Sequence, residues 1–172
     1  MSAIACALGG SKATLWNYFP SKEVLFNAVM DRATRDFRAR LSVILSTQGD
    51  VEATLRSFCT VFLHKVTAPE SIALYQLAIS EANRFPEVGR IFHERGPKRT
   101  LEQLAEYISG MMDRDLLRKA DPLFAARQLV GVCLSGSHQR LLLGVLQKVT
   151  PALIEEDVDR TIDIFMRGYA PE

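Results

Sequence analysis

The chain has 172 residues, of which 48% are hydrophobic and 24% charged, and its formal net charge is +1. This is the composition of an ordinary globular protein with room for one real core and a small appended module. No stretch of about 18 apolar residues lacks a charge, and no basic region followed by an apolar stretch opens the chain, which excludes a membrane span and a secretory signal and favours the cytoplasm.

Charge is distributed unevenly between the two ends of the chain. Residues 1–40 contain six basic and three acidic side chains, whereas residues 151–172 contain two basic and six acidic ones. This distribution suits a protein that contacts phosphates at one end only. An imbalance of this size is also common by chance, so it carries weight only beside a motif.

The first predicted elements form a helix-turn-helix near the N-terminus. After residues 1–5, which have the character of a helix, the order is turn, N-cap, short mixed helix, Pro and second N-cap. Leu15 and Phe19 are four residues apart, so one face of the short helix packs inward while the other is free to enter a major groove. The turn and cap signals come from Gly9, Gly10, Ser11, Pro20 and Ser21.

This segment resembles the recognition segment of the TetR/AcrR family of bacterial transcriptional regulators. The resemblance runs from Leu8 to Glu23 and reads LGGSKATLWNYFPSKE. Gly10 stands where the family usually has Val, and Trp16 replaces the usual Tyr. The family has one further helix, and the start of the next, before this segment, so we expect the first helix to be absent and the DNA-binding head to be truncated.

The resemblance implies which side chains contact operator DNA. Side chains in the first turn of a recognition helix reach base edges, and Asn is suited to an adenine edge. The hydrogen-bond donors of Trp and Tyr side chains, and a Lys at the start of the following helix, are suited to phosphates. The expected DNA contacts are Lys12, Thr14, Trp16, Asn17, Tyr18 and Lys22.

Helical periodicity continues through the rest of the chain, and no alternating strand pattern appears. A long amphipathic helix is expected over 21–47, and Asp50 is expected to cap the next one. The helix that opens at Pro69 is apolar almost all round, so we expect it to be central. A capping residue followed by Pro at the first helical position marks the start of two further helices, at Asp121-Pro122 and Thr150-Pro151. The remaining helices are expected over about 51–66, 69–84, 87–95, 98–113, 121–143 and 151–168.

The sequence therefore predicts an all-α protein in two parts. Residues 1–42 are expected to form the partial helix-turn-helix domain and residues 43–172 a helical ligand-binding and dimerisation domain. Short phrases within 74–87 and 121–128 are similar to the C-terminal region of the AefR-like subgroup. In the family the last two long helices build a four-helix dimer interface, which implies a homodimer through helices 121–143 and 151–168.

A small apolar effector is expected among the C-terminal helices, where bulky side chains are able to line a cavity. For any single one of these residues, ordinary core packing is the stronger interpretation. The candidate pocket residues are Phe58, Phe62, Tyr75, Ile79, Phe92, Tyr107 and Met111.

No metal site, cofactor or catalytic centre is expected. The chain has no HExxH, GxSxG, Walker or GxGxxG motif, and its histidines are isolated. Cys6, Cys59 and Cys133 are widely spaced, so they are interpreted as small core residues.

The resemblance thus implies a ligand-responsive, DNA-binding transcriptional regulator, of the repressor kind, that acts as a homodimer and is not an enzyme. An alternative remains open. The expected loss of the first helix, together with Gly10, is also compatible with a dimeric small-molecule-binding module whose truncated head is non-functional. Binding to operator DNA separates the two interpretations.

Overall fold

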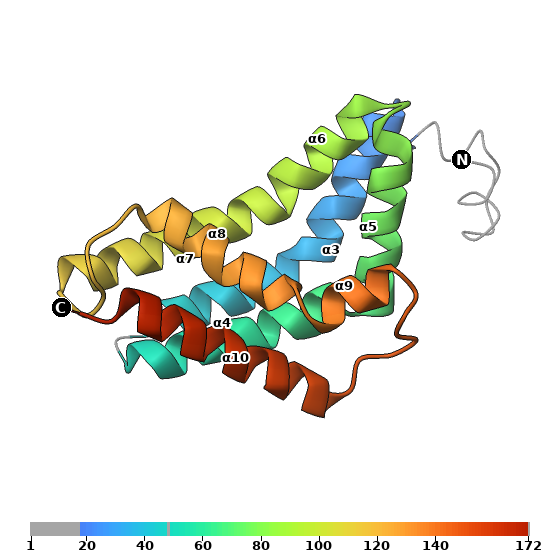
Figure 1. Ribbon diagram of the computed structural model, residues 1–172. Helices are drawn as coiled ribbons and strands as arrows, with labels where there is room; N and C mark the ends of the chain where they lie inside the picture. The colour runs from blue at the N-terminus through green and yellow to red at the C-terminus, as the bar shows by residue number, and fades with distance from the viewer. Residues whose placement is uncertain (1–17, 48, 172) are drawn as a thin grey trace.

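The computed structural model describes residues 18–47 and 49–171, which form eight helices and no strand (Figure 1). The all-α prediction is confirmed. The first of these helices runs through the boundary expected at residue 42 without a break, and the division into 1–42 and 43–172 stays a prediction. In order, the helices are α3 (Lys22–Leu45), α4 (Val51–Val66), α5 (Pro69–Ala82), α6 (Pro86–Arg95), α7 (Pro97–Asp113), α8 (Pro122–Leu134), α9 (Ser137–Leu142) and α10 (Pro151–Tyr169).

Most helix starts follow the signals seen in the sequence. Four N-cap side chains accept a hydrogen bond from the backbone N–H three residues on, at 2.7 to 3.3 Å. Each satisfies one of the donors that a helix start leaves without a partner. These caps are Ser21, Asp50, Asp121 and Thr150.

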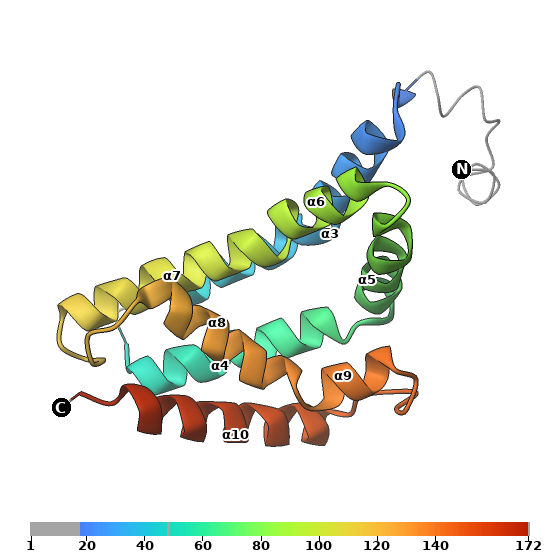
Figure 2. The same ribbon diagram turned by 45° about the horizontal axis from the view of Figure 1, so that its top comes forward.

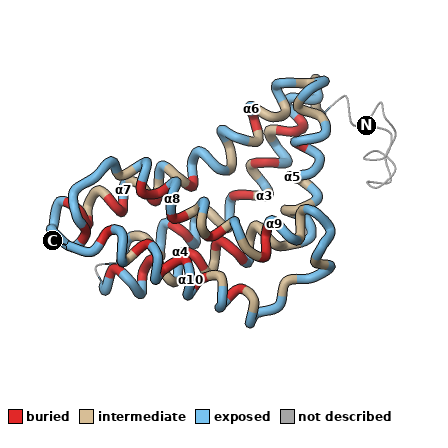
Figure 3. The backbone as a smooth tube through the Cα atoms, in the orientation of Figure 1, coloured by how far each residue is buried: buried red, intermediate tan, exposed pale blue. Residues whose placement is uncertain are grey.

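The helices pack in two layers that meet along α7 and α8 and are bridged at the other end by α5. Figure 2 shows α6 and α7 running end to end along α3, with α4, α8 and α10 on the other side, and α5 and α9 at the end. The tube in Figure 3 shows buried positions recurring along the inward side of α10, as its amphipathic pattern requires. These buried α10 residues include Ile154, Val158, Ile162, Phe165 and Tyr169.

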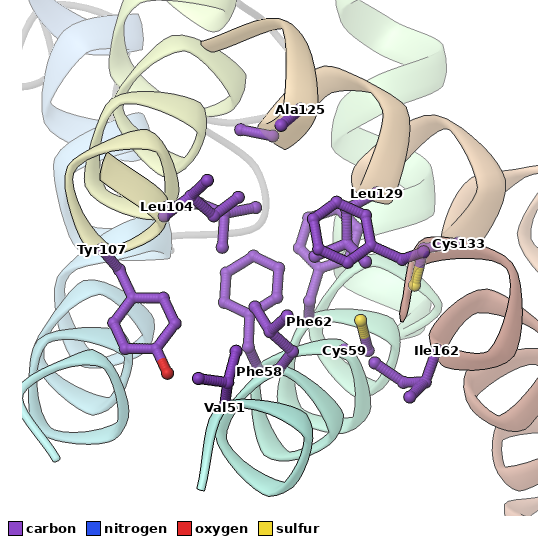
Figure 4. Close-up of a cluster of buried hydrophobic side chains, with 14 of the residues drawn as sticks. Val51, Phe58, Cys59, Phe62, Leu104, Tyr107, Ala125, Leu129, Cys133 and Ile162 are labelled. Atoms are coloured by element: carbon purple, nitrogen blue, oxygen red, sulfur yellow. The ribbon is translucent and has the colours of Figure 1, made fainter. Parts of the chain in front are cut away.

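Two separate clusters of buried side chains hold the layers together. The main core is built from α4, α7, α8 and α10, with Leu41 from α3, and part of it is drawn in Figure 4. The second cluster is small and joins Phe26 and Met30 of α3 to Ala78 of α5 and Ile91 of α6. Helix α3 therefore contributes its N-terminal half to one cluster and its C-terminal half to the other.

Two buried cysteines meet inside the main core. Cys59 of α4 and Cys133 of α8 are fully buried, and their sulfur atoms lie close together (Figure 4). The neighbouring Cys59 thiol and burial raise the pKa of Cys133. Both residues are packing residues, as predicted, and a thiol with a raised pKa is a poor nucleophile. Cys6 lies outside the described residues.

The prediction that the helix beginning at Pro69 is central was wrong. Ala78 is the only buried residue in α5, and the Ile79 side chain is 59% exposed. The helix lies at the end of the bundle and packs mainly on α6. One side of α5 faces α6, another side lines a cavity, and the apolar side chains of Leu77 and Ile79 are exposed.

The prediction of a single helix over 121–143 was also wrong, because the helix is interrupted at Ser135–Gly136 and divides into α8 and α9. The Asp157 carboxylate, from α10, accepts a hydrogen bond from the Ser137 N–H at 2.9 Å. A Cβ atom at residue 136 would collide with that carboxylate, so Gly is required for this close approach. The break is caused by a contact with α10, which lies about twenty residues further along the chain.

Candidate ligand-binding cavity

A cavity of about 320 Å³ lies between the two apolar clusters. Helices α3 to α8 all contribute to its wall, and His138 adds a side chain from α9. Met30, Leu74 and Phe92 on one side belong to, or pack against, the small cluster, whereas Phe37 and Phe62 pack in the main core. The volume lies in the range of about 300 to 1,000 Å³ that is typical of small-molecule sites.

Aromatic side chains make up much of this wall. The rings of Phe37 and Phe62 are 6.4 Å apart between centroids and tilted by 41°. On the other side, Tyr75 packs edge-on against Phe92 at 5.5 Å and against His138 at 5.9 Å. These arrangements leave ring surfaces along an apolar space that is suited to a flat hydrophobic molecule.

The structure brings together only some of the pocket residues expected from the sequence. Phe62, Tyr75 and Phe92 line the cavity. Ile79 is exposed and lies beside a shallower depression on the outer side of Tyr75 and Phe92. The other candidates are buried in the main core and do not line the cavity; they are Phe58, Tyr107 and Met111.

Sequence reasoning missed the contribution of α3 to the cavity. The amphipathic pattern that predicts a helix over 21–47 does not show that part of its apolar stripe faces an open space. A helix stripe of this kind looks the same in sequence whether another helix or a cavity faces it. The α3 residues on the wall are Val29, Met30, Ala33, Thr34, Phe37 and Arg38.

A cluster of three charged side chains closes one edge of the cavity. Arg95 Nη1 of α6 donates to both carboxylate oxygens of Asp31 of α3, at 2.8 and 3.1 Å. Arg38 Nη2 lies 4.0 Å from the same carboxylate. Both arginines line the cavity, and the cluster joins α3 to the end of α6.

His138 is the buried titratable group on the wall, with a side chain that is 6% exposed. Burial lowers its pKa, because the charged imidazolium loses its hydration in the protein interior. The imidazole is therefore neutral at pH 7 and presents one donor and one acceptor beside the Tyr75 ring.

Replacing His138 by Gln is expected to reduce an acid-dependent loss of stability. The unfolded chain binds a proton at this residue near its ordinary pKa of about 6.5, whereas the folded chain binds it only at lower pH. The free energy of unfolding therefore falls as the pH drops from about 6.5 toward the lowered pKa. Denaturant unfolding at about pH 7.5 and about pH 5.5 should differ less for His138→Gln than for the unchanged chain.

The matched control for this experiment is His64→Gln, because His64 is exposed on α4. This control should keep the pH dependence of the unchanged chain. Equal pH dependence in His138→Gln and in the unchanged chain would contradict the effect assigned to burial of His138.

Most of the predicted DNA contacts lie outside the described residues, namely Lys12, Thr14, Trp16 and Asn17. Tyr18 is described and is 77% exposed. The Lys22 ammonium lies 4.4 Å from the centre of the Phe85 ring, a cation–π contact that ties the start of α3 to the turn between α5 and α6. The DNA contacts of these residues stay predictions.

Two further properties concern the part of the chain that the structure describes. None of its helices combines the length and the apolar character needed to cross a membrane. Its His, Cys, Asp and Glu side chains form no group of three or more that is able to hold a metal ion.

An all-helical bundle with an internal aromatic cavity, preceded by a helix-turn-helix signature, defines a class of ligand-binding transcriptional regulators. The family described as "AefR-like transcriptional repressor, C-terminal domain" matches residues 53–171, and "Bacterial regulatory proteins, tetR family" matches residues 1–29. The chain therefore belongs to the TetR family, with an AefR-like C-terminal domain. It is a ligand-responsive, DNA-binding transcriptional regulator, and repressor action and dimer formation are typical of this family.

Solved structures of similar proteins share the fold. A putative TetR-family transcriptional regulator from Mesorhizobium loti superposes with a TM-score of 0.84 at 24% identity, covering 97% of this chain and 84% of that one. The flavonoid-responsive regulator FrrA has a TM-score of 0.77 and 30% identity over 100% of this chain and 87% of its own. A TetR-family regulator from Pseudomonas syringae has a TM-score of 0.76 and 21% identity, over 98% and 84% of the two chains. A comparison with curated proteins found no match.

Proposed function

We propose that this regulator is a homodimeric repressor whose effector, a small and largely apolar molecule, binds in the cavity and releases operator DNA. The observation that carries the proposal is the place of the cavity between the two apolar clusters, with α3 forming one wall. Residues 1–42 act as the DNA-binding part and also supply one wall of the effector cavity through α3, whereas residues 43–172 supply the rest of the cavity and the surface for the partner subunit. Its place of action is the bacterial cytoplasm, where the operator lies.

Helix α3 connects the two activities. It begins at Lys22, directly after the predicted recognition segment, and it lines the cavity further along. A ligand that separates the small cluster from the main core changes the direction of the N-terminal half of α3. Because paired recognition helices must match half-sites about 34 Å apart, a small rotation of each head is enough to lower operator affinity. The ligand has this effect only if it binds the released conformation more tightly.

A planar aromatic effector is favoured by the cavity wall. Four aromatic side chains line it, and the relative that is 30% identical is a flavonoid-responsive regulator. A fused or linked ring system stacks on such walls and removes a large apolar area from water. The four aromatic residues are Phe37, Phe62, Tyr75 and Phe92.

The proposed dimer surface is made by α8 and α10, which lie side by side (Figure 1). On α8 the exposed stripe is Phe124, Gln128, Gly131 and Ser135, spaced by four, three and four residues. The Tyr169 hydroxyl of α10 bonds to the Gln128 side chain, which places this stripe beside α10. Phe124 of α8 and Ile164 of α10 are 55% and 54% exposed, and the small exposed residues Gly131 and Ser135 allow close approach of a second pair of helices.

The substitution Ala33→Trp tests the proposed function by filling the cavity. We expect operator binding to be kept, while the affinity for unsubstituted flavone, used as the probe, falls at least about tenfold, because the indole occupies ligand space. Calorimetry measures the affinity for flavone. A gel shift with operator DNA selected in vitro measures how far flavone releases the protein from that DNA. Ala39→Trp is the matched control, because Ala39 is exposed on the same helix and does not line the cavity.

Equal flavone release from Ala33→Trp and Ala39→Trp would place the effector elsewhere. Effector binding by a chain that binds no selected DNA would instead favour the binding module without a functional head.

A further inference from the structure

Cationic side chains predominate on the wall of the effector cavity. Arg38 of α3, Lys65 of α4 and Arg95 of α6 all line it, and each is half-buried. Glu70, which is exposed at the start of α5, is the one carboxylate on the wall within the described part of the chain. The apolar cavity therefore has an excess of positive charge around it.

These cations differ in how well they are paired. Arg95 binds both oxygens of Asp31, so its charge is compensated. Arg38 has only the 4.0 Å contact with the same carboxylate and no hydrogen bond to it within the described part of the chain. Lys65 forms no ion pair within the described part of the chain either. A guanidinium has five donors in a planar fork, and most of those of Arg38 are available to a ligand.

The other polar groups on the wall do not compete for this role. The Thr34 hydroxyl donates to the Met30 carbonyl at 2.8 Å, and the Thr100 hydroxyl donates to the Gly96 carbonyl at 3.3 Å. His138 lies in the aromatic part of the wall, against Tyr75. Arg38 and Lys65 are therefore the cationic donors on the wall without a hydrogen-bonded carboxylate in the described part of the chain, and the planar fork of Arg38 is the one that matches a carboxylate.

We propose that the effector is an aromatic carboxylate whose ring system lies against the aromatic wall and whose carboxylate pairs with Arg38. This inference rests on the proposed function, because it assigns a chemical class to the ligand of the same cavity. A carboxylate in a partly desolvated site forms short, charge-assisted bonds with a guanidinium, and these bonds are about twice as strong as neutral ones. A neutral ligand of the same shape would leave the excess cations without a partner.

The position of Asp31 gives the carboxylate of the ligand a second effect. Asp31 lies between Arg38 and Arg95 and ties α3 to α6. A ligand carboxylate at Arg38 repels Asp31 and competes with it for both arginines. Effector binding therefore weakens the tie that holds the N-terminal half of α3 against α6, in the direction that the proposed release requires.

The experiment compares 2-naphthoate with 2-naphthamide, which has nearly the same shape and no charge. Calorimetry at about pH 7.5 keeps the acid ionised, and we expect it to bind at least about tenfold more tightly than the amide. Arg38→Gln should abolish this preference, whereas Arg35→Gln should keep it, because Arg35 is exposed on the same helix and does not line the cavity. Asp31→Asn should raise the affinity for 2-naphthoate, since it removes the competing carboxylate.

The possible outcomes separate this inference from the proposed function. Equal binding of acid and amide, or a preference that survives in Arg38→Gln, overturns the carboxylate assignment. If flavone or the amide then still binds and Ala33→Trp blocks it, the cavity remains the effector site. If flavone binds and neither naphthalene probe does, the carboxylate class is wrong. If no probe binds, the cavity assignment fails as well.

Discussion

The double substitution Lys12→Ala and Tyr18→Ala is expected to weaken binding to selected operator DNA at least about 30-fold. Each side chain is assigned a contact worth about 1–3 kcal/mol, and the two contacts belong to the same recognition helix. Loss of the Lys12 charge should also reduce the slope of affinity against salt concentration by about one. Gel shifts or fluorescence anisotropy over a salt series measure both quantities.

The double variant should still bind effector, because Tyr18 is exposed and does not line the cavity. Lys148→Ala is the matched control for charge, since Lys148 is exposed in the loop before α10. It should leave operator affinity unchanged. Unchanged affinity and salt slope in Lys12→Ala with Tyr18→Ala would show that the recognition helix lies elsewhere.

The second large effect is expected at the proposed dimer surface. Phe124→Asp with Ile164→Asp places two charges in an apolar interface, and in a two-fold dimer each substitution occurs twice. Loss of an apolar contact of this kind costs about 1.5–3 kcal/mol, and burial of unpaired carboxylates adds to that cost. The dimer dissociation constant should therefore rise at least about 100-fold, as measured by sedimentation or light scattering over a concentration series.

Dimer loss should also weaken operator binding, because the two half-sites are then bound independently. Val43→Asp provides the control, since Val43 is an exposed apolar residue on α3 rather than on α8 or α10. This control should remain dimeric. A double variant that stays dimeric at low concentration would move the interface to another surface.

The first prediction concerns a feature for which the sequence pattern is informative. A recognition segment is local, so its turn, caps and apolar pair are visible within fifteen residues or so of the printed sequence. The dimer surface, by contrast, was expected from the family resemblance, and the exposure of Phe124 and Ile164 is seen only in the folded chain. The effector inference likewise depends on Asp31 and Arg95, which are 64 positions apart and meet only in the folded chain.

The sequence by itself determined the helical class, most helix starts, the amphipathic face of α10 and the family. These features depend on contacts within one turn or on the 3.6-residue period, so a single stretch of residues contains the signal. Only the tertiary structure decided that α5 is peripheral, that Asp157 breaks the expected long helix at Gly136, and that α3 faces a cavity. Each of these follows from how distant helices pack, and an apolar side chain has the same identity in sequence whether it meets a neighbour or an empty space.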